Sequence, residues 1–146
     1  TGGELVIVNL SSPEAARIAH TLKFDGNPVS WGLQADLFFV ITQSEAASDA
    51  AVITQIYSLS LQSPAHASIV AKQQLDGRRQ SIILPEGIFL LRPEEYSSSK
   101  NTASSLMLQA MTFDASGKLA LGGKAIISAS QLVAWRTSRR RRRKLK

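Results

Sequence analysis

The chain has 146 residues, of which 44% are hydrophobic, and a net charge of +6, which fits a single domain with a core of its own. It contains no cysteine, which excludes a disulfide framework, a thiolate zinc site and a cysteine nucleophile. No apolar run approaches the roughly 20 residues of a membrane helix, and the N-terminus lacks a signal-peptide pattern, so we expect a soluble protein.

The first two elements expected along the chain are a strand and a helix. The segment GELVIVNL (residues 3–10) has alternating faces and predicts a strand. In the segment that follows, Ser12, Pro13 and Glu14 stand in the order of an N-cap, a first-turn proline and an acid that suits the helix dipole. This order predicts a short helix from about residue 13 to residue 22.

Strands are expected next, after the turn signal FDGNP, in residues 29–43 and 52–63. In the second run, Ile53, Tyr57 and Leu59 share one face at period two, while small polar residues occupy the other face. This alternation is typical of a half-buried antiparallel strand with one face toward solvent.

Two hairpins are predicted in the second half of the chain. Asp76-Gly77 stands between strand-like flanks, which favours a hairpin with a type I′ turn. Residues 87–93 predict a short strand, and the polar residues 94–105 predict an exposed loop. Residues 105–113 and 118–135 predict a second hairpin, with Gly117 in a left-handed conformation and a bulge or bend at Gly122-Gly123.

About eight short strands and one short helix indicate an all-β fold, either a sandwich or a barrel. Four phenylalanines lie within apolar strand runs, so we expect them in the core and not on a base-stacking platform: Phe38, Phe39, Phe89 and Phe113. Trp135 stands where the last strand meets the tail. Two roles stay open for it, namely anchoring that strand in the core and stacking on a base.

Positive charge is concentrated at the C-terminal end. Eight of the 17 basic residues and none of the 11 acidic ones follow Trp135, so residues 136–146 carry +8 and the first 135 residues carry −2. Arginine keeps its charge and presents five donors in a planar fork, so an arginine run contacts phosphates without a defined fold. We therefore expect this tail to bind nucleic acid with little sequence preference. The candidate residues are Arg136, Arg139, Arg140, Arg141, Arg142, Arg143, Lys144 and Lys146.

Other roles for the tail stay open. A basic cluster of this length is similar to a nuclear localisation signal. It is also compatible with cleavage by a protease that recognises basic sites, and with attachment to an anionic membrane surface. A merely solvated charge run is the weakest alternative, because mixed signs serve solubility better than charges of one sign.

No pattern in the sequence predicts a catalytic or metal site. His20 and His66 have no carboxylate at metal-ligand spacing, and we expect both at the surface. The serines lack a G-x-S-x-G motif, and the LGGKA segment lacks the spacing of a phosphate-binding loop. We therefore expect no enzymatic activity, no catalytic residue, no metal and no cofactor.

An all-β body with its charge gathered in a terminal arginine-rich arm resembles the small virus coat (capsid) proteins of jelly-roll type. The resemblance implies a jelly-roll-like antiparallel β-sandwich over residues 1–135 that packs into a closed shell. It also implies that residues 136–146 form the arm that neutralises the packaged genome. In many of these families the arm is N-terminal, whereas in this chain it is C-terminal.

Together these expectations describe a structural coat protein of a virion that self-assembles and binds packaged nucleic acid. The expected partners are nucleic acid, RNA in preference to DNA, and further copies of the chain up to a closed shell, with no membrane. The alternative is a non-enzymatic nucleic-acid-binding regulator of the host cytoplasm or nucleus. In that case the protein is a monomer or dimer, and the tail serves binding and nuclear import.

Overall fold

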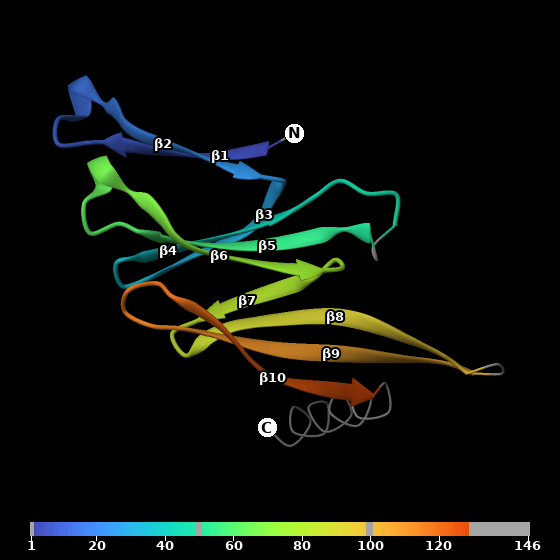
Figure 1. The fold of residues 1–146 in the computed structure, drawn as a ribbon. Coiled ribbons are helices and arrows are strands. Elements are labelled where there is room, and N and C mark those ends of the chain that lie inside the picture. The colour runs from blue at the N-terminus through green and yellow to red at the C-terminus, as the bar shows by residue number, and fades with distance from the viewer. Residues whose placement is uncertain (1, 49–50, 99–100, 129–146) are drawn as a thin grey trace, which may run out of the picture.

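The computed structural model describes residues 2–48, 51–98 and 101–128 (Figure 1). These residues form ten strands and the short 3-10 turns η1 (Pro13–Ala15) and η3 (Pro64–His66), and they contain no α-helix. The strands are β1 (Gly2–Asn9), β2 (Arg17–Asp25), β3 (Asn27–Gln34), β4 (Leu37–Gln43), β5 (Ile53–Ser60), β6 (Ser68–Asp76), β7 (Gln80–Leu84), β8 (Gly87–Ser98), β9 (Asn101–Phe113) and β10 (Leu119–Ser128).

Three antiparallel sheets account for all ten strands. β1 and β2 form a two-stranded sheet, and the two four-stranded sheets have the orders β3-β4-β5-β6 and β7-β8-β9-β10. The expected all-β antiparallel class is therefore confirmed. The jelly-roll strand order is not confirmed, because a jelly roll consists of two Greek keys, whereas each four-stranded sheet here follows the order of the chain.

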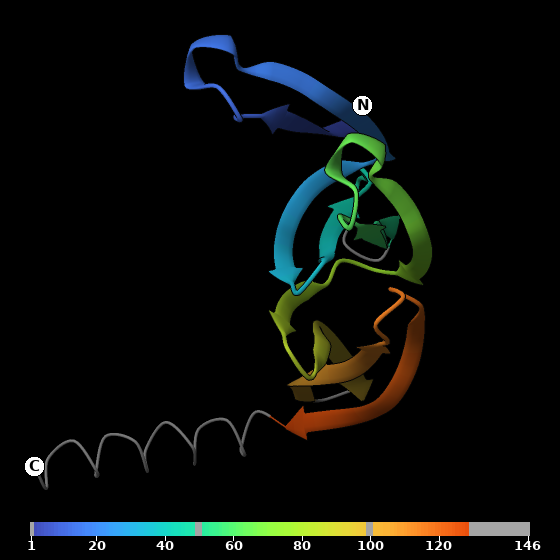
Figure 2. The ribbon, with the colours of Figure 1, turned by 90° about the vertical axis from the view of Figure 1, so that its left-hand side faces the viewer.

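The two four-stranded sheets share one hydrophobic core. Its buried residues are Leu37, Phe39 and Ile41 of β4, Ile56 of β5, Ile88 and Leu90 of β8, and Met111 of β9. The rings of Phe39 and Phe113 lie 4.6 Å apart between their centres, which confirms the core position expected for these two phenylalanines. At the sides of the core β3 lies next to β7 and β6 next to β10, as the end-on view in Figure 2 shows.

The β1–β2 hairpin covers part of the outer face of the β3–β6 sheet (Figure 1). A second cluster lies between them, formed by Phe24 of β2, Val40 of β4, and Tyr57 and Leu59 of β5. The Phe24 and Tyr57 rings are 4.9 Å apart between centres. The hairpin is therefore attached to the sheet through aromatic and aliphatic side chains at one of its ends.

β5 confirms the strand expected in residues 52–63, but the expectation of a half-buried strand is wrong. Thr54 and Ser58 on its polar face have no exposed surface, because this face points toward the other four-stranded sheet. Tyr57 and Leu59 on its apolar face are also buried, because the β1–β2 hairpin covers them. β5 therefore has no solvent face along its centre.

The helix expected over residues 13–22 is wrong. Only the short turn η1 forms, and the chain then continues as β2. In β2 the exposure alternates, with Leu22 and Phe24 less exposed than the residues beside them. Leu22 stands opposite Leu5 of β1. This pairing lets both strands bury one apolar face, which outweighs the local helix-capping signals.

The hairpin expected at Asp76-Gly77 is also wrong. β6 and β7 belong to different sheets, so the residues between them connect the two sheets. Gly77 does adopt a positive φ, of +82°. Its amide donates to the Val52 carbonyl and its carbonyl accepts from Thr54 Oγ1, both at 2.8 Å. These bonds hold the turn against β5, so β6 and β7 do not face each other.

The second expected hairpin is confirmed for β9 and β10, while residues 129–135 of its expected second strand lie outside the described residues. Gly117 in its turn has a φ of +88°. A Cβ atom added there would lie 2.6 Å from Ser58 Oγ and 2.6 Å from Val70 Cγ2, so the turn packs closely on the β3–β6 sheet. The strand register shifts between Leu121 and Lys124, which confirms the irregularity expected at Gly122-Gly123.

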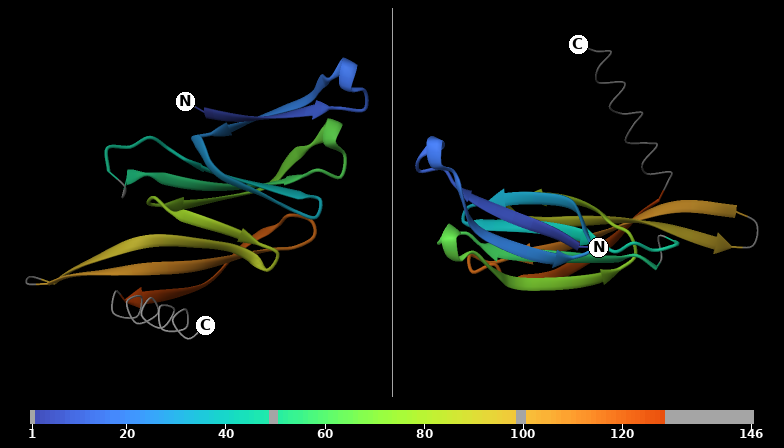
Figure 3. Two further views of the ribbon diagram at one scale, coloured as in Figure 1. Left: turned by 180° about the vertical axis from the view of Figure 1, so that it is seen from behind. Right: turned by 90° about the horizontal axis from the view of Figure 1, so that it is seen from above.

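The exposed loop expected over residues 94–105 is wrong for residues 94–98 and 101–105, whose backbone belongs to β8 and β9, and residues 99–100 lie outside the described residues. Glu94 pairs with Ser105, and Tyr96 with Ala103. The two strands form a long ribbon that projects past its neighbours (Figure 3). Antiparallel backbone hydrogen bonds form whatever the side chains are, so polar composition alone does not exclude a strand.

Candidate functional site

The residues expected to bind nucleic acid lie outside the described part of the chain, which ends with β10 at Ser128. These are Arg136, Arg139, Arg140, Arg141, Arg142, Arg143, Lys144 and Lys146. Trp135 lies in the same segment. The structure therefore gives no position for the predicted site, and its role stays a prediction.

The two histidines lie on separate elements. His20 is half-buried in β2, not in a helix, and His66 is exposed at the end of η3. Among residues 2–48, 51–98 and 101–128, no three His, Asp or Glu side chains are grouped as metal ligands. No helix in those same ranges combines the length and apolar character needed to cross a membrane.

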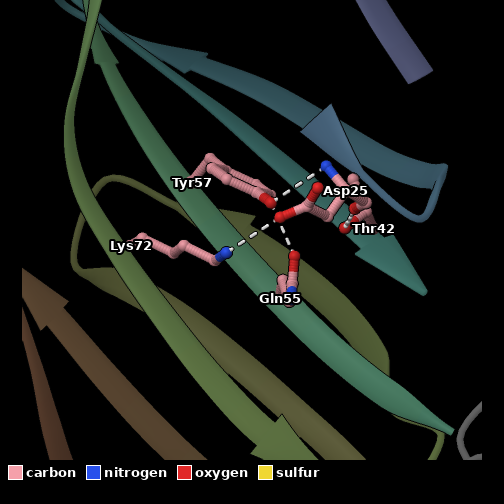
Figure 4. A network of polar contacts seen from close by, with 5 residues as sticks. All are labelled: Asp25, Thr42, Gln55, Tyr57 and Lys72. Carbon is pink, nitrogen blue, oxygen red and sulfur yellow. Dashed lines mark hydrogen bonds and ion pairs between the residues drawn. The ribbon is translucent and has the colours of Figure 1, made fainter. Parts of the chain in front are cut away.

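A polar network joins the end of β2 to the β3–β6 sheet (Figure 4). The Asp25 amide donates to Tyr57 Oη at 3.2 Å, and Thr42 Oγ1 donates to the Asp25 carbonyl at 2.6 Å. The Tyr57 hydroxyl donates in turn to Gln55 Oε1. Lys72 Nζ lies 3.2 Å from Asp25 Oδ2 and 5.3 Å from the centre of the Tyr57 ring. These five residues therefore connect four strands, namely β2, β4, β5 and β6.

The protonation of Lys72 decides what this network can do. Partial desolvation alone would lower the pKa of Lys72, but the hydrogen bond and charge of Asp25 and the contact with Tyr57 together raise it above 10.5. The amine is therefore protonated at neutral pH, which disfavours a role as nucleophile or base. The geometry instead serves to fix the β1–β2 hairpin to the sheet.

A second feature is an exposed apolar surface over the neighbouring strands β3 and β7. We call it the β3–β7 surface, and it consists of Val29, Trp31, Leu33, Ile82 and Leu84. Trp31 is 71% exposed, and its ring stacks on Phe38 with 5.8 Å between centres. Neither strand contains a charged residue. Large exposed apolar patches are typical of protein interaction sites, which makes this surface a candidate for one.

The apolar residues of this surface recur at every second position of β3 and β7. This period-two signal is visible in the sequence, but it does not tell which face of a strand is covered. On the inner side, a Cβ at Gly32 would lie 3.0 Å from the Ile83 side chain, so that face is closed between the two strands. The exposed side could be recognised only once the strand neighbours were known.

Comparison of the chain with protein-family models, with curated proteins and with solved structures finds no match. No fold or function is therefore transferred from another protein. The charge distribution, the β3–β7 surface and the polar groups described above are the features from which function can be inferred.

Proposed function

We propose that this chain is a structural protein of coat-protein type, which self-assembles through a β-sandwich body and binds RNA through its C-terminal tail. The division of charge carries the proposal: the first 135 residues have a net charge of −2 and residues 136–146 have +8. A nearly neutral body allows copies to pack without strong repulsion. The basic tail neutralises phosphates, so the two parts have separate partners.

The β3–β7 surface supports the self-association part of the proposal. In this proposal the two four-stranded sheets around the shared core are the sandwich, and β3 and β7 are edge strands of those sheets. The two strands contain no charged residue, so burying this surface between copies would desolvate no charge. Trp31 on this surface is of the residue type most enriched at the centres of protein interfaces.

Arginine chemistry supports the nucleic-acid part. Phosphate contacts release counterions, so affinity should fall steeply with salt concentration. With about five to eight contacts, the slope of log K against log salt would be roughly −3.5 to −7. Contacts to phosphate carry no base information, so sequence preference should be slight.

The tail can be tested by comparing two replacements of Arg139–Arg143 with a deletion of residues 136–146. Replacement by lysine keeps the charge and should retain most RNA binding, whereas replacement by glutamine and the deletion should weaken it strongly. Circular dichroism should show that all three proteins remain β-rich. Undiminished binding by the tail-less protein, or indifference to salt between about 0.05 and 0.5 M, would contradict RNA binding by the tail.

Self-assembly can be tested by light scattering of the full chain with and without RNA. We expect large particles, and we expect Trp31→Lys to shift them toward small species. Thr21→Lys is the matched control, because Thr21 is exposed on β2 away from the β3–β7 surface. A small species for the natural chain under all conditions would overturn the shell and favour a monomeric or dimeric regulatory protein.

A further inference from the structure

Arg79 is a buried cation that forms no ion pair with any residue the structure describes. It lies in the connection between β6 and β7 and is only 6% exposed. Its Nε donates to the Asp76 carbonyl at 3.2 Å, and its Nη1 donates to Gln109 Oε1 at 3.1 Å. Both acceptors are uncharged, and Arg79 forms no salt bridge within the described part of the chain. Burying a charge without an opposite charge is unfavourable, so an anion beside Arg79 would be stabilising.

Arg79 lines a pocket of about 440 Å³ between β6 and β10, a volume in the range of small-molecule sites. The lining residues are Gln74, Leu75, Asp76, Arg79, Arg92, Met107, Gln109, Leu121 and Lys124. Three of them are cations and one is a carboxylate. Burial, and then the charge of Arg92, lower the pKa of Arg79, and the charge of Asp76 only partly opposes this. Arginine nevertheless stays charged at neutral pH.

The lining combines hydrogen-bond donors with an apolar wall. Gln109 accepts from Arg79 through Oε1, and its Nε2 group donates to no residue that the structure describes. Lys124 contributes a second type of cation from the exposed part of β10. Leu75 and Leu121 contribute apolar surface to the same pocket. A ligand that suits this lining has a compact oxyanion at one end and an apolar ring at the other.

We propose that the pocket binds the phosphate group of a nucleotide. Arg79, Arg92 and Lys124 surround the phosphate, while Leu75 and Leu121 contact the sugar or base. Guanidinium groups match phosphate oxygens in geometry and charge. Both free nucleotides and nucleic acids carry this group. All lining residues belong to the folded body, so the inference holds whether or not the tail binds RNA.

The test uses the full chain, labelled with ¹⁵N, titrated with adenosine 5′-monophosphate and, separately, with adenosine. The nucleotide should shift the Nε–H resonance of Arg79 and the side-chain amide resonances of Gln109, and adenosine should not. Inorganic phosphate should shift the same signals at higher concentration, because it lacks the apolar part. If millimolar nucleotide shifts only tail resonances, the pocket proposal is wrong.

Lys124→Gln is the decisive variant, and Lys118→Gln is its matched control. Both lysines are exposed near or on β10, but only Lys124 lines the pocket. Losing one charged contact should weaken nucleotide binding at Arg79 and Gln109 by about five- to tenfold, and the control should change it by less than about twofold. Equal weakening by both variants would mean nonspecific attraction to a basic protein and would overturn the site. Neither substitution removes a buried group, so both proteins should fold.

Oligonucleotides with and without a 5′-phosphate identify the source of the phosphate. If both shift Arg79 and Gln109, the pocket accepts backbone phosphates. If only the phosphorylated one does, it accepts terminal or free nucleotides. Either result supports the pocket. If neither the oligonucleotides nor the mononucleotide shift these resonances, the proposal is wrong.

Discussion

Gly117→Ala should destabilise the fold strongly, because two separate costs coincide at this position. Its φ of +88° places an L-residue in the left-handed region, at a cost of about 1–2 kcal/mol. The added Cβ would lie 2.6 Å from Ser58 Oγ and 2.6 Å from Val70 Cγ2, and overpacking of this kind costs about 1–3 kcal/mol. The free energy of unfolding should therefore fall by about 2–5 kcal/mol, since these costs add.

Urea unfolding and thermal unfolding can measure this loss. For a chain of this size a change of 1 kcal/mol corresponds to about 3 °C, so the Tm should fall by about 6–15 °C. Gly123→Ala is the control, because no atom lies within 4 Å of its added Cβ. That variant should keep its stability or gain up to about 1 kcal/mol. Equal behaviour of the two alanine variants would refute the close packing of the β9–β10 turn on β5 and β6.

Two further predictions concern hydroxyl groups. Thr54→Val should lower the free energy of unfolding by about 1–2 kcal/mol, because it removes the buried hydrogen bond to the Gly77 carbonyl. Ser58→Ala should leave the Tm unchanged or raise it, because Ser58 Oγ is buried and has no partner among the described residues. A larger loss of stability in Ser58→Ala than in Thr54→Val would contradict this assignment. The Ser116 hydroxyl, followed by backbone amides, lowers the pKa of Asp114 below 3.8. The resulting stabilisation is complete above pH 3.8 and is lost as the pH falls through the lowered pKa, so an NMR titration of Ser116→Ala should show the pKa of Asp114 moving back toward 3.8.

The features predicted correctly from the sequence are those that depend on neighbouring residues. Gly117 and Gly122-Gly123 were recognised from turn and bulge chemistry, and both lie in a hairpin whose strands pair directly. Gly77 has the positive φ that the expected type I′ turn requires of it, whereas Asp76 does not. The groups that direct the turn are Val52, just before β5, and Thr54 on β5. The turn residue could be recognised locally, whereas the partner of the following strand could not.

The candidate sites also differ in whether they can be recognised from local sequence or only from contacts between distant residues. The arginine run is visible as composition, yet the pocket depends on Arg79 and Gln109, which stand 30 positions apart and meet only when the two sheets pack. Local rules also favoured a helix at residues 13–22, where pairing of β2 with β1 decided the outcome. Trp31 was overlooked because nothing local shows that its face is left uncovered.

The order of strands has a consequence for how the protein forms. In the described ranges every strand pairing joins neighbours along the chain, and the connection Gly77–Arg79 links the two four-stranded sheets. Short loops close at low entropic cost, so we expect faster folding than for Greek-key proteins of similar length. During synthesis the β3–β6 sheet has all its strands before β7 emerges from the ribosome. The second sheet would then assemble against a surface that already exists, and Arg79, in the connection before β7, would reach that surface before any strand of the second sheet.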